Sequence, residues 1–230
     1  MNKKLWILGL ALMLASAAYA QQATNFSVEL NADSTGIIIT KYTGNAVNVI
    51  VPTTLEGLPV TGIGKGAFKD NMTINKVSIY KGVTEIRDEA FQGCRNLNSI
   101  TLPDTLKKIG ERAFDSTGLL SISIPGGCNE LGEAAFSNAS RLTSIVFPAN
   151  FTAIPANAFL NCTALATVGL PAAIKTIGSK AFGGCTALTT FNVNSSVSAI
   201  TFAQDVFAGC TKLNLGAQVA IKKLGYTGTF

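Results

Sequence analysis

The dipeptide Ala-Phe recurs along this chain at a nearly constant spacing. It stands at Ala67-Phe68, Ala90-Phe91, Ala113-Phe114, Ala135-Phe136, Ala158-Phe159 and Ala181-Phe182, and Val206-Phe207 closes the series. Successive phenylalanines are 23, 23, 22, 23, 23 and 25 residues apart. A fixed period of this length is typical of a solenoid, in which each repeat forms one coil that packs against its neighbours. We therefore predict a repeat solenoid built from coils of 22–23 residues.

Each repeat carries the same pattern after its phenylalanine. The segment "ITLP" of residues 100–103 alternates apolar and polar residues, which predicts a short strand with one buried face. A proline ends this strand in several repeats, because proline has no N–H to give to a ladder. Stacked coils then align these strands into a parallel sheet. The segment before the phenylalanine, as in residues 109–114, predicts either a helical turn or a second short strand.

The cysteines follow the same register. Four of the five stand three residues after a phenylalanine, where other repeats have asparagine, threonine or alanine; they are Cys94, Cys162, Cys185 and Cys210. Cys128 takes a position that other repeats fill with Val, Leu, Phe or Ile. Because a free cysteine behaves as a small hydrophobe, we predict buried core cysteines. The alternative is a disulfide between adjacent coils, such as Cys162–Cys185, which needs Cα atoms within about 7 Å.

Both ends of the chain depart from the repeat. Residues 1–20 combine two lysines, a short apolar run and an Ala-Tyr-Ala site, which predicts an export signal cut before Gln21. Residues 21–46 predict an N-terminal β-hairpin cap, residues 47–213 the solenoid, and residues 214–230 a C-terminal cap whose helix stops at Gly225. The apolar run is too short to span a membrane and no second one follows. We expect a secreted or cell-surface protein without a membrane span, and a periplasmic location is the open alternative.

Composition excludes several classes of function. The chain has no histidine, which removes Ser-His-Asp and Cys-His catalysis and histidine-ligated metal sites. The acidic pairs Asp88-Glu89 and Glu130/Glu133 are interpreted as a solvated face rather than a glycosidase pair. The odd cysteine count and the missing C-x-x-C pattern argue against zinc. The charge after signal removal is 16 basic minus 13 acidic, or +3, without a basic stripe, so nucleic acid is not an expected partner. We predict no enzyme activity, no metal and no cofactor.

The strand pattern places alternate residues on the outer face of the sheet. These outward positions predict a flat surface of aligned small polar residues, with candidate partner-binding residues Ser99, Thr101, Ser121, Ser123, Ser144, Val146, Thr167, Gly169, Thr190 and Asn192. Residues 142–174 contain no charge, which suggests a contact surface around the third and fourth of these strands. The alternative is that small polar residues simply suit exposed strands.

The segment "KGVTEIRDEAFQGCRNLNSITLP" of residues 81–103 displays the full repeat. The pattern, which extends over residues 47–213, resembles the BspA-like leucine-rich repeats of bacterial surface and secreted proteins. The resemblance implies an α/β repeat, a right-handed curved leucine-rich-repeat solenoid with a parallel sheet. It also implies adhesion, since members of the family are reported to bind host matrix proteins such as fibronectin and fibrinogen.

The leading hypothesis is therefore an exported, non-enzymatic leucine-rich repeat protein that mediates protein–protein interaction or adhesion through its solenoid face. One alternative is a structural, self-assembling envelope component. A less favoured alternative is a carbohydrate-active solenoid enzyme. The partner and the oligomeric state stay open at this level.

Overall fold

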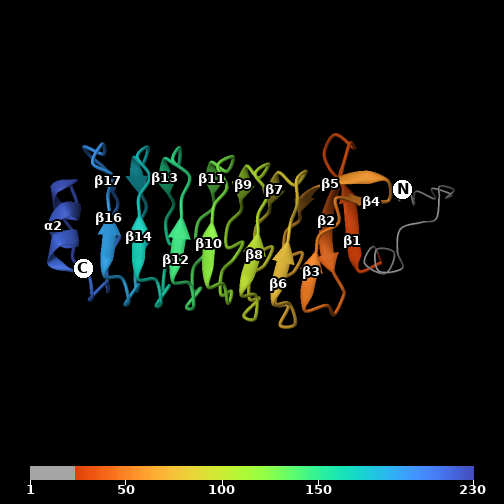
Figure 1. The fold of residues 1–230 in the computed structure, drawn as a ribbon, viewed down its shortest axis with the longest axis horizontal. Helices are drawn as coiled ribbons and strands as arrows, with labels where there is room; N and C mark the ends of the chain where they lie inside the picture. Colours follow the sequence, from red (N-terminus) through yellow and green to blue (C-terminus); the bar gives the residue numbers. More distant parts are fainter. Residues whose placement is uncertain (1–23) are drawn as a thin grey trace.

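The computed structural model describes residues 24–230, which form an elongated solenoid with the first described strand and the C-terminal helix at opposite ends (Figure 1). Each coil contains a front strand, a turn, a short back strand and a second turn. The front strands are β3 (Asn48–Ile50), β6 (Lys76–Ser78), β8 (Ser99–Thr101), β10 (Ser121–Ser123), β12 (Ser144–Val146), β14 (Thr167–Gly169) and β16 (Thr190–Asn192). The back strands are β5 (Leu58–Ile63), β7 (Glu85–Ile86), β9 (Lys108–Ile109), β11 (Glu130–Leu131), β13 (Ala153–Ile154), β15 (Thr176–Ile177) and β17 (Thr201–Phe202).

The sequence period sets the strand register. Neighbouring front strands pair in parallel, with Lys76 opposite Ser99 and Ser144 opposite Thr167. The segment before each phenylalanine forms a back strand followed by turns, so the second-strand alternative is correct and the helical alternative is not. In the described part of the chain, the α-helix belongs to the C-terminal cap rather than to the coils.

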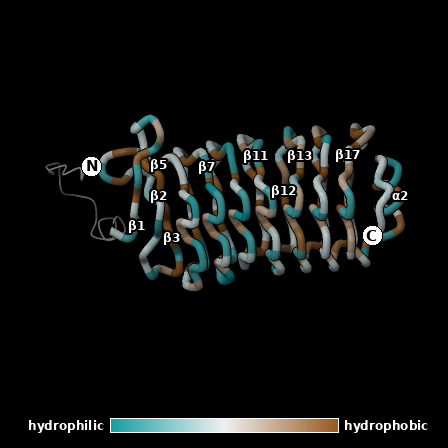
Figure 2. The backbone as a smooth tube through the Cα atoms, turned by 180° about the vertical axis from the view of Figure 1, so that it is seen from behind, coloured by the Kyte–Doolittle hydropathy of each residue, from teal (hydrophilic) through white to brown (hydrophobic). Residues whose placement is uncertain are grey.

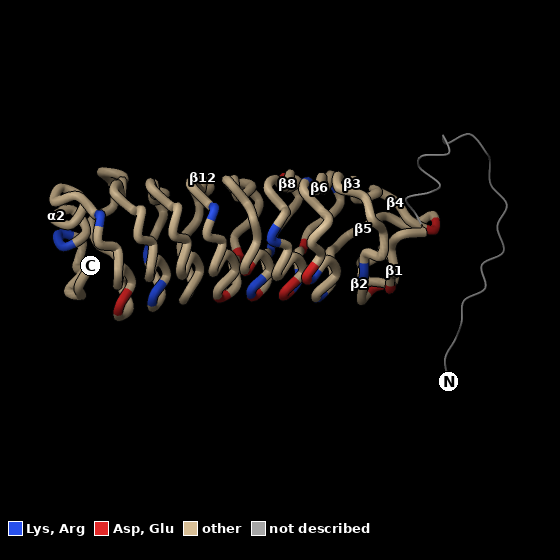
Figure 3. The backbone as a smooth tube through the Cα atoms, turned by 90° about the horizontal axis from the view of Figure 1, so that it is seen from below, with Lys and Arg blue, Asp and Glu red and all other residues tan. Residues whose placement is uncertain are grey.

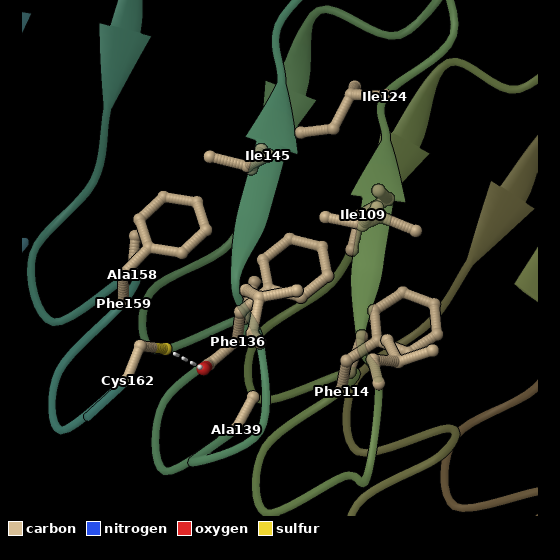
Figure 4. Close-up of a cluster of buried hydrophobic side chains, with 14 of the residues drawn as sticks. Ile109, Phe114, Ile124, Phe136, Ala139, Ile145, Ala158, Phe159 and Cys162 are labelled. Carbon is tan, nitrogen blue, oxygen red and sulfur yellow. Dashed lines mark hydrogen bonds between the residues drawn. The ribbon is translucent and has the colours of Figure 1, made fainter. Parts of the chain in front are cut away.

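The phenylalanines form a continuous stack through the core (Figure 4). Rings of adjacent coils lie 4.7–5.8 Å apart with interplanar angles of 13° or less, from Phe68 to Phe207. The preceding alanines are also buried, and Phe91 donates its N–H to the Ala113 carbonyl at 2.8 Å. A small residue beside each ring lets the backbones approach to this hydrogen-bonding distance. In Figure 2 hydrophobic segments recur from coil to coil, as this repeated core requires.

The cysteines lie in this core, as predicted. All five thiols are free and fully buried, so a disulfide between Cys162 and Cys185 is not formed. Four of them face the carbonyl of the phenylalanine one coil earlier. The Sγ of Cys162 donates to the Phe136 carbonyl oxygen at 3.1 Å, and Cys185 repeats this contact with Phe159 at 3.2 Å. These four thiols therefore act as small hydrophobes, each with one weak hydrogen bond to the previous coil.

Two positions in every coil adopt left-handed backbone geometry, two residues before and two residues after the phenylalanine. Glycine occupies only a few of them. The earlier position is held by Gly66, Glu89, Arg112, Ala134, Asn157, Lys180 and Asp205, and the later one by Asp70, Gly93, Ser116, Asn138, Asn161, Gly184 and Gly209. These turns reverse the chain between the back and front strands. Non-glycine residues pay a conformational penalty there.

Replacing Lys180 by glycine should therefore stabilise the protein. Lys180 is exposed at φ 51°, and Gly66 holds the same position in the first coil. We expect the free energy of unfolding to rise by about 0.5–1 kcal/mol, because removing the left-handed penalty outweighs the added freedom of the unfolded chain. Denaturant unfolding measures the change. The matched control is Lys175→Gly, which should lower stability because Lys175 has an ordinary φ; equal effects of the two changes would contradict the explanation.

The two ends are capped as the sequence predicts. At the N-terminal end β1 (Phe26–Leu30) pairs antiparallel with β2 (Ile37–Tyr42), which continues in parallel to β5, while β4 (Thr54–Leu55) pairs antiparallel with β5. At the other end α2 (Leu215–Lys223) begins at the N-cap Asn214, whose side chain accepts from the Ala217 N–H at 2.8 Å. Ala217 and Ile221 are the buried residues of this helix, and Gly225 follows it at φ 108°.

The parallel sheets are interrupted at two places. The back sheet ends at β11 and resumes at β13. Gly110 directly follows β9 and Gly178 directly follows β15, and each donates its N–H to the back strand one coil earlier. The equivalent residue after β13 is Pro155, which has no N–H to donate to β11. The front sheet breaks between β8 and β10, where the chain leading into β10 is one residue shorter than in the neighbouring coils.

The proposed export signal, residues 1–20, lies outside the described residues. Within residues 24–230, no helix combines the length and the apolar character that crossing a membrane requires.

Candidate interaction face

The front strands separate inward from outward residues. In β10, β12 and β14 the central residue is buried and its two neighbours are exposed. The ten predicted residues all lie on this outer face, which we call the front face: nine are exposed and Thr190 is half-buried. The period-2 pattern located them correctly, because the central residue of each strand must point into the core.

The front face consists of two sheet segments. Ser99 and Thr101 belong to the sheet β3-β6-β8, and the other eight residues belong to β10-β12-β14-β16. In the second segment Ser121, Ser144, Thr167 and Thr190 stand opposite one another in a single row. The sequence interpretation did not extend the face to Asn48 and Ile50, which flank the buried Val49 in β3. The alternation in "NVIVP" was the signal that could have found them.

Most hydroxyl groups of this face form no hydrogen bond within the described part of the chain. Among the ten residues, the one side-chain hydrogen bond within the described part of the chain is a 3.4 Å contact between Thr190 and Thr189. Hydroxyls just before the strands are used inside the solenoid instead: Thr143 donates to the Leu120 carbonyl at 2.9 Å. The hydroxyl of Thr143, just before β12, therefore links two coils, whereas the hydroxyl of the next residue, Ser144, points to the outside of the solenoid.

The centre of the front face is uncharged and partly apolar. Val146 is 60% exposed, and a side chain added at Gly169 would meet open space. Ser144 and Thr167 lie beside them in paired strands. Figure 3 shows most charged residues on the coils nearer the N-terminal end, and the ion pairs of the described residues all lie between residues 29 and 130. A surface without charged groups can be buried by a partner at a low desolvation cost.

The thiols offer no nucleophile. Burial raises the pKa of Cys94, Cys162 and Cys210 to about 12 and that of Cys128 to about 11, and it raises the pKa of Cys185 further still. A thiol attacks as its thiolate, so these groups are unreactive at neutral pH.

Carboxylates of both acidic pairs form ion pairs or hydrogen bonds with neighbouring coils. Glu89 forms an ion pair with Lys69 at 2.7 Å, and the hydrogen bond from Lys69 lowers the pKa of this carboxyl. Asp88 accepts the Glu111 N–H at 2.9 Å, and Glu130 lies 3.6 Å from Lys108. In residues 24–230, no group of three or more His, Cys, Asp or Glu is arranged to hold a metal ion.

The back sheet carries a shallow groove of about 630 Å³ between β9 and β17. Its lining consists mainly of aliphatic and small residues, including Ala153, Pro155 and Ala203. Lys108 and Glu130 are the ionisable residues of the lining, and they pair with each other. The groove therefore presents no convergent acid and base.

A rigid stack of coils with a flat, preformed face defines a leucine-rich repeat solenoid, a fold suited to protein interaction. The chain belongs to the family of the BspA type leucine-rich repeat, whose model matches residues 61–189 and 140–217 in six copies. No curated protein matches the chain.

Two solved structures are similar to this solenoid. The leucine-rich repeat protein TpLRR of T. pallidum has 34% sequence identity and a TM-score of 0.85, over 90% of this chain and 97% of that one. The pneumococcal vaccine antigen PcpA has 21% identity and a TM-score of 0.63, over 82% of this chain and 55% of that one, and shows the shared fold.

Proposed function

We propose that this protein is an exported, non-enzymatic leucine-rich repeat protein that binds another protein through the front face. The observation that carries the proposal is the row of hydroxyls beside the exposed Val146, at the uncharged centre of the face; those of Ser121, Ser144 and Thr167 form no hydrogen bond within the described residues. The coils hold this surface in place before binding, so little conformational entropy is lost when a partner docks. Membership of the BspA-like family and the signal-like residues 1–20 support a role in adhesion at the bacterial surface, and host matrix proteins are the first partners to test.

The test places charge at the centre of the face. The double variant Val146→Glu/Gly169→Asp should weaken binding to immobilised fibronectin or fibrinogen by about tenfold or more, because a partner would have to bury unpaired carboxylates. Both sites are exposed and Gly169 has open space, so the fold should persist. Surface plasmon resonance measures the affinity.

The matched control is Thr176→Glu, an equally simple addition of charge on an exposed position of the back sheet. It should bind like the unmodified protein. Equal binding by all three proteins would contradict a role for the front face. Light scattering of the same samples tests the structural alternative, which requires assemblies that the double variant disrupts.

A further inference from the structure

The chain segment that leads into β10 is shorter than its equivalents. Ile122 stands eight residues after Phe114, whereas Ile100 and Ile145 stand nine after their phenylalanines. The adjacent turns keep their full length, so a notch of about 340 Å³ opens at the edge of the solenoid where the front strands begin. Its lining is Arg95, Ser116, Thr117, Gly118, Asn138, Ser140 and Arg141.

The floor of the notch is closed by backbone. Gly118 donates its N–H to the Cys94 carbonyl at 3.2 Å, and a Cβ there would collide with the Arg95 carbonyl oxygen. Thr117 is buried and its hydroxyl donates to the Phe114 carbonyl at 2.9 Å. The shortened segment is therefore pressed against the previous coil, and no side chain at position 118 can fill the space above it.

The two arginines at the rim differ from the other arginines of the chain. Arg87 pairs with Glu85 and Glu29, and Arg112 lies 3.8 Å from Glu111. Arg95 and Arg141 form no ion pair in the described part of the chain. Arg141 reaches across the shortened segment and donates from Nη1 to the Asn98 side-chain oxygen at 2.8 Å, which leaves its other N–H groups for a ligand.

The acidic group nearest in sequence to this lining is already satisfied. Asp115 accepts hydrogen bonds from the side chains of Gln92 at 2.9 Å, Asn138 at 2.9 Å and Ser116 at 3.2 Å. It is not part of the lining, whereas both guanidinium groups are. The notch therefore has a positive rim and an additional hydroxyl, that of Ser140.

We propose that this notch binds an oxyanion, namely a phosphate or sulfate group carried as a monoester. Guanidinium groups present planar forks of N–H donors that match tetrahedral oxyanions. The two arginines supply the charge, and the Ser140 hydroxyl supplies a further donor. The space exceeds that of the ion alone, so it admits part of the group that carries the ester. The site does not depend on whether the front face binds a protein.

The test is an NMR titration of the ¹⁵N-labelled protein at constant ionic strength. Inorganic sulfate, inorganic phosphate, glucose 6-sulfate and glucose 6-phosphate are the probes, and chloride is the background. We expect saturable shifts at the amides of Ser116, Thr117, Gly118 and Ser140. The difference between the sulfate and phosphate arms identifies the preferred ester, and either preference supports the site.

The deciding variant is Arg95→Gln/Arg141→Gln, which should raise the dissociation constant at least about fivefold, as loss of charge-assisted hydrogen bonds predicts. Arg112→Gln is the matched control and should bind like the unmodified protein. An inserted asparagine after Gly118 restores the nine-residue spacing and should also abolish binding; if that variant does not fold, the arginine variants decide. Unsaturable shifts, or equal affinity in the double arginine variant, would overturn the proposal.

Discussion

Replacing Phe136 by alanine is expected to lower the free energy of unfolding by about 4 kcal/mol. The side chain is fully buried and stacks between Phe114 at 5.2 Å and Phe159 at 5.5 Å. The flanking rings cannot close the cavity, because backbone hydrogen bonds between coils hold them in place; Phe114 donates to Ala135 at 2.8 Å and Phe136 to Ala158 at 2.9 Å. Lost burial and an unfilled cavity both contribute to the loss.

Denaturant unfolding followed by circular dichroism measures this effect. Phe202→Ala is the matched control, because Phe202 is only partly buried in the last back strand and should cost about 1 kcal/mol. Each coil contacts only its neighbours, so a central cavity should also broaden the transition by weakening the coupling between the two halves. Equal losses for the two variants would show that the stack is not the main source of stability.

Alkaline pH is expected to unfold the protein between pH 9 and 12. Burial raises the pKa of Cys94, Cys162 and Cys210 from 9.0 to about 12 and that of Cys128 to about 11, and the pKa of Cys185 is also raised. Below pH 9 the thiols are protonated in both states and their contribution to stability is fully present. Above pH 9 the unfolded chain loses these protons while the folded chain keeps them, so the unfolded state is favoured.

The expected loss is about 1.4 kcal/mol per thiol for each pH unit between 9 and the pKa of that thiol in the folded protein, and all five thiols act in the same direction. Unfolding curves at pH 8, 9, 10 and 11 measure it. Cys185→Ala should reduce the slope by about one fifth, because one thiol is removed and alanine already occupies this position in the coil of Ala139. A stability that stays flat from pH 8 to pH 11 would contradict buried, protonated thiols.

Several features of the fold followed from single residues in the sequence. The alternation around Ile145 and Val168 placed Ser144, Val146, Thr167 and Gly169 on one face, because only one side of a solenoid strand is buried. The left-handed turns did not follow, because Ala134 and Lys180 carry no local signal for positive φ. Their geometry is imposed by the contacts between coils.

The two candidate surfaces differ in how much the sequence showed. The outward orientation of the ten candidate residues followed from the alternation within each repeat, but the extension of the front face to Asn48 and Ile50 was not predicted. The notch was not predicted, because Arg95 and Arg141 are separated by two coils in the sequence and meet at one cavity only after stacking. The break in the back sheet at Pro155 was also not predicted. The sequence shows that Pro155 lacks an N–H, but only the structure shows that this position donates to the neighbouring back strand in other coils.

The sequence by itself determined the solenoid, its period and the core position of the phenylalanines and cysteines. The physical reason is that an apolar residue recurring at a fixed interval can be buried in every repeat only if the repeats are stacked in register. Only the tertiary structure decided how a missing residue before β10 is accommodated. A coil that is one residue short could shift the strand register, distort the turn or leave an open notch. Here Gly118 lies against the previous coil and the turns on either side keep their full length, so a notch remains.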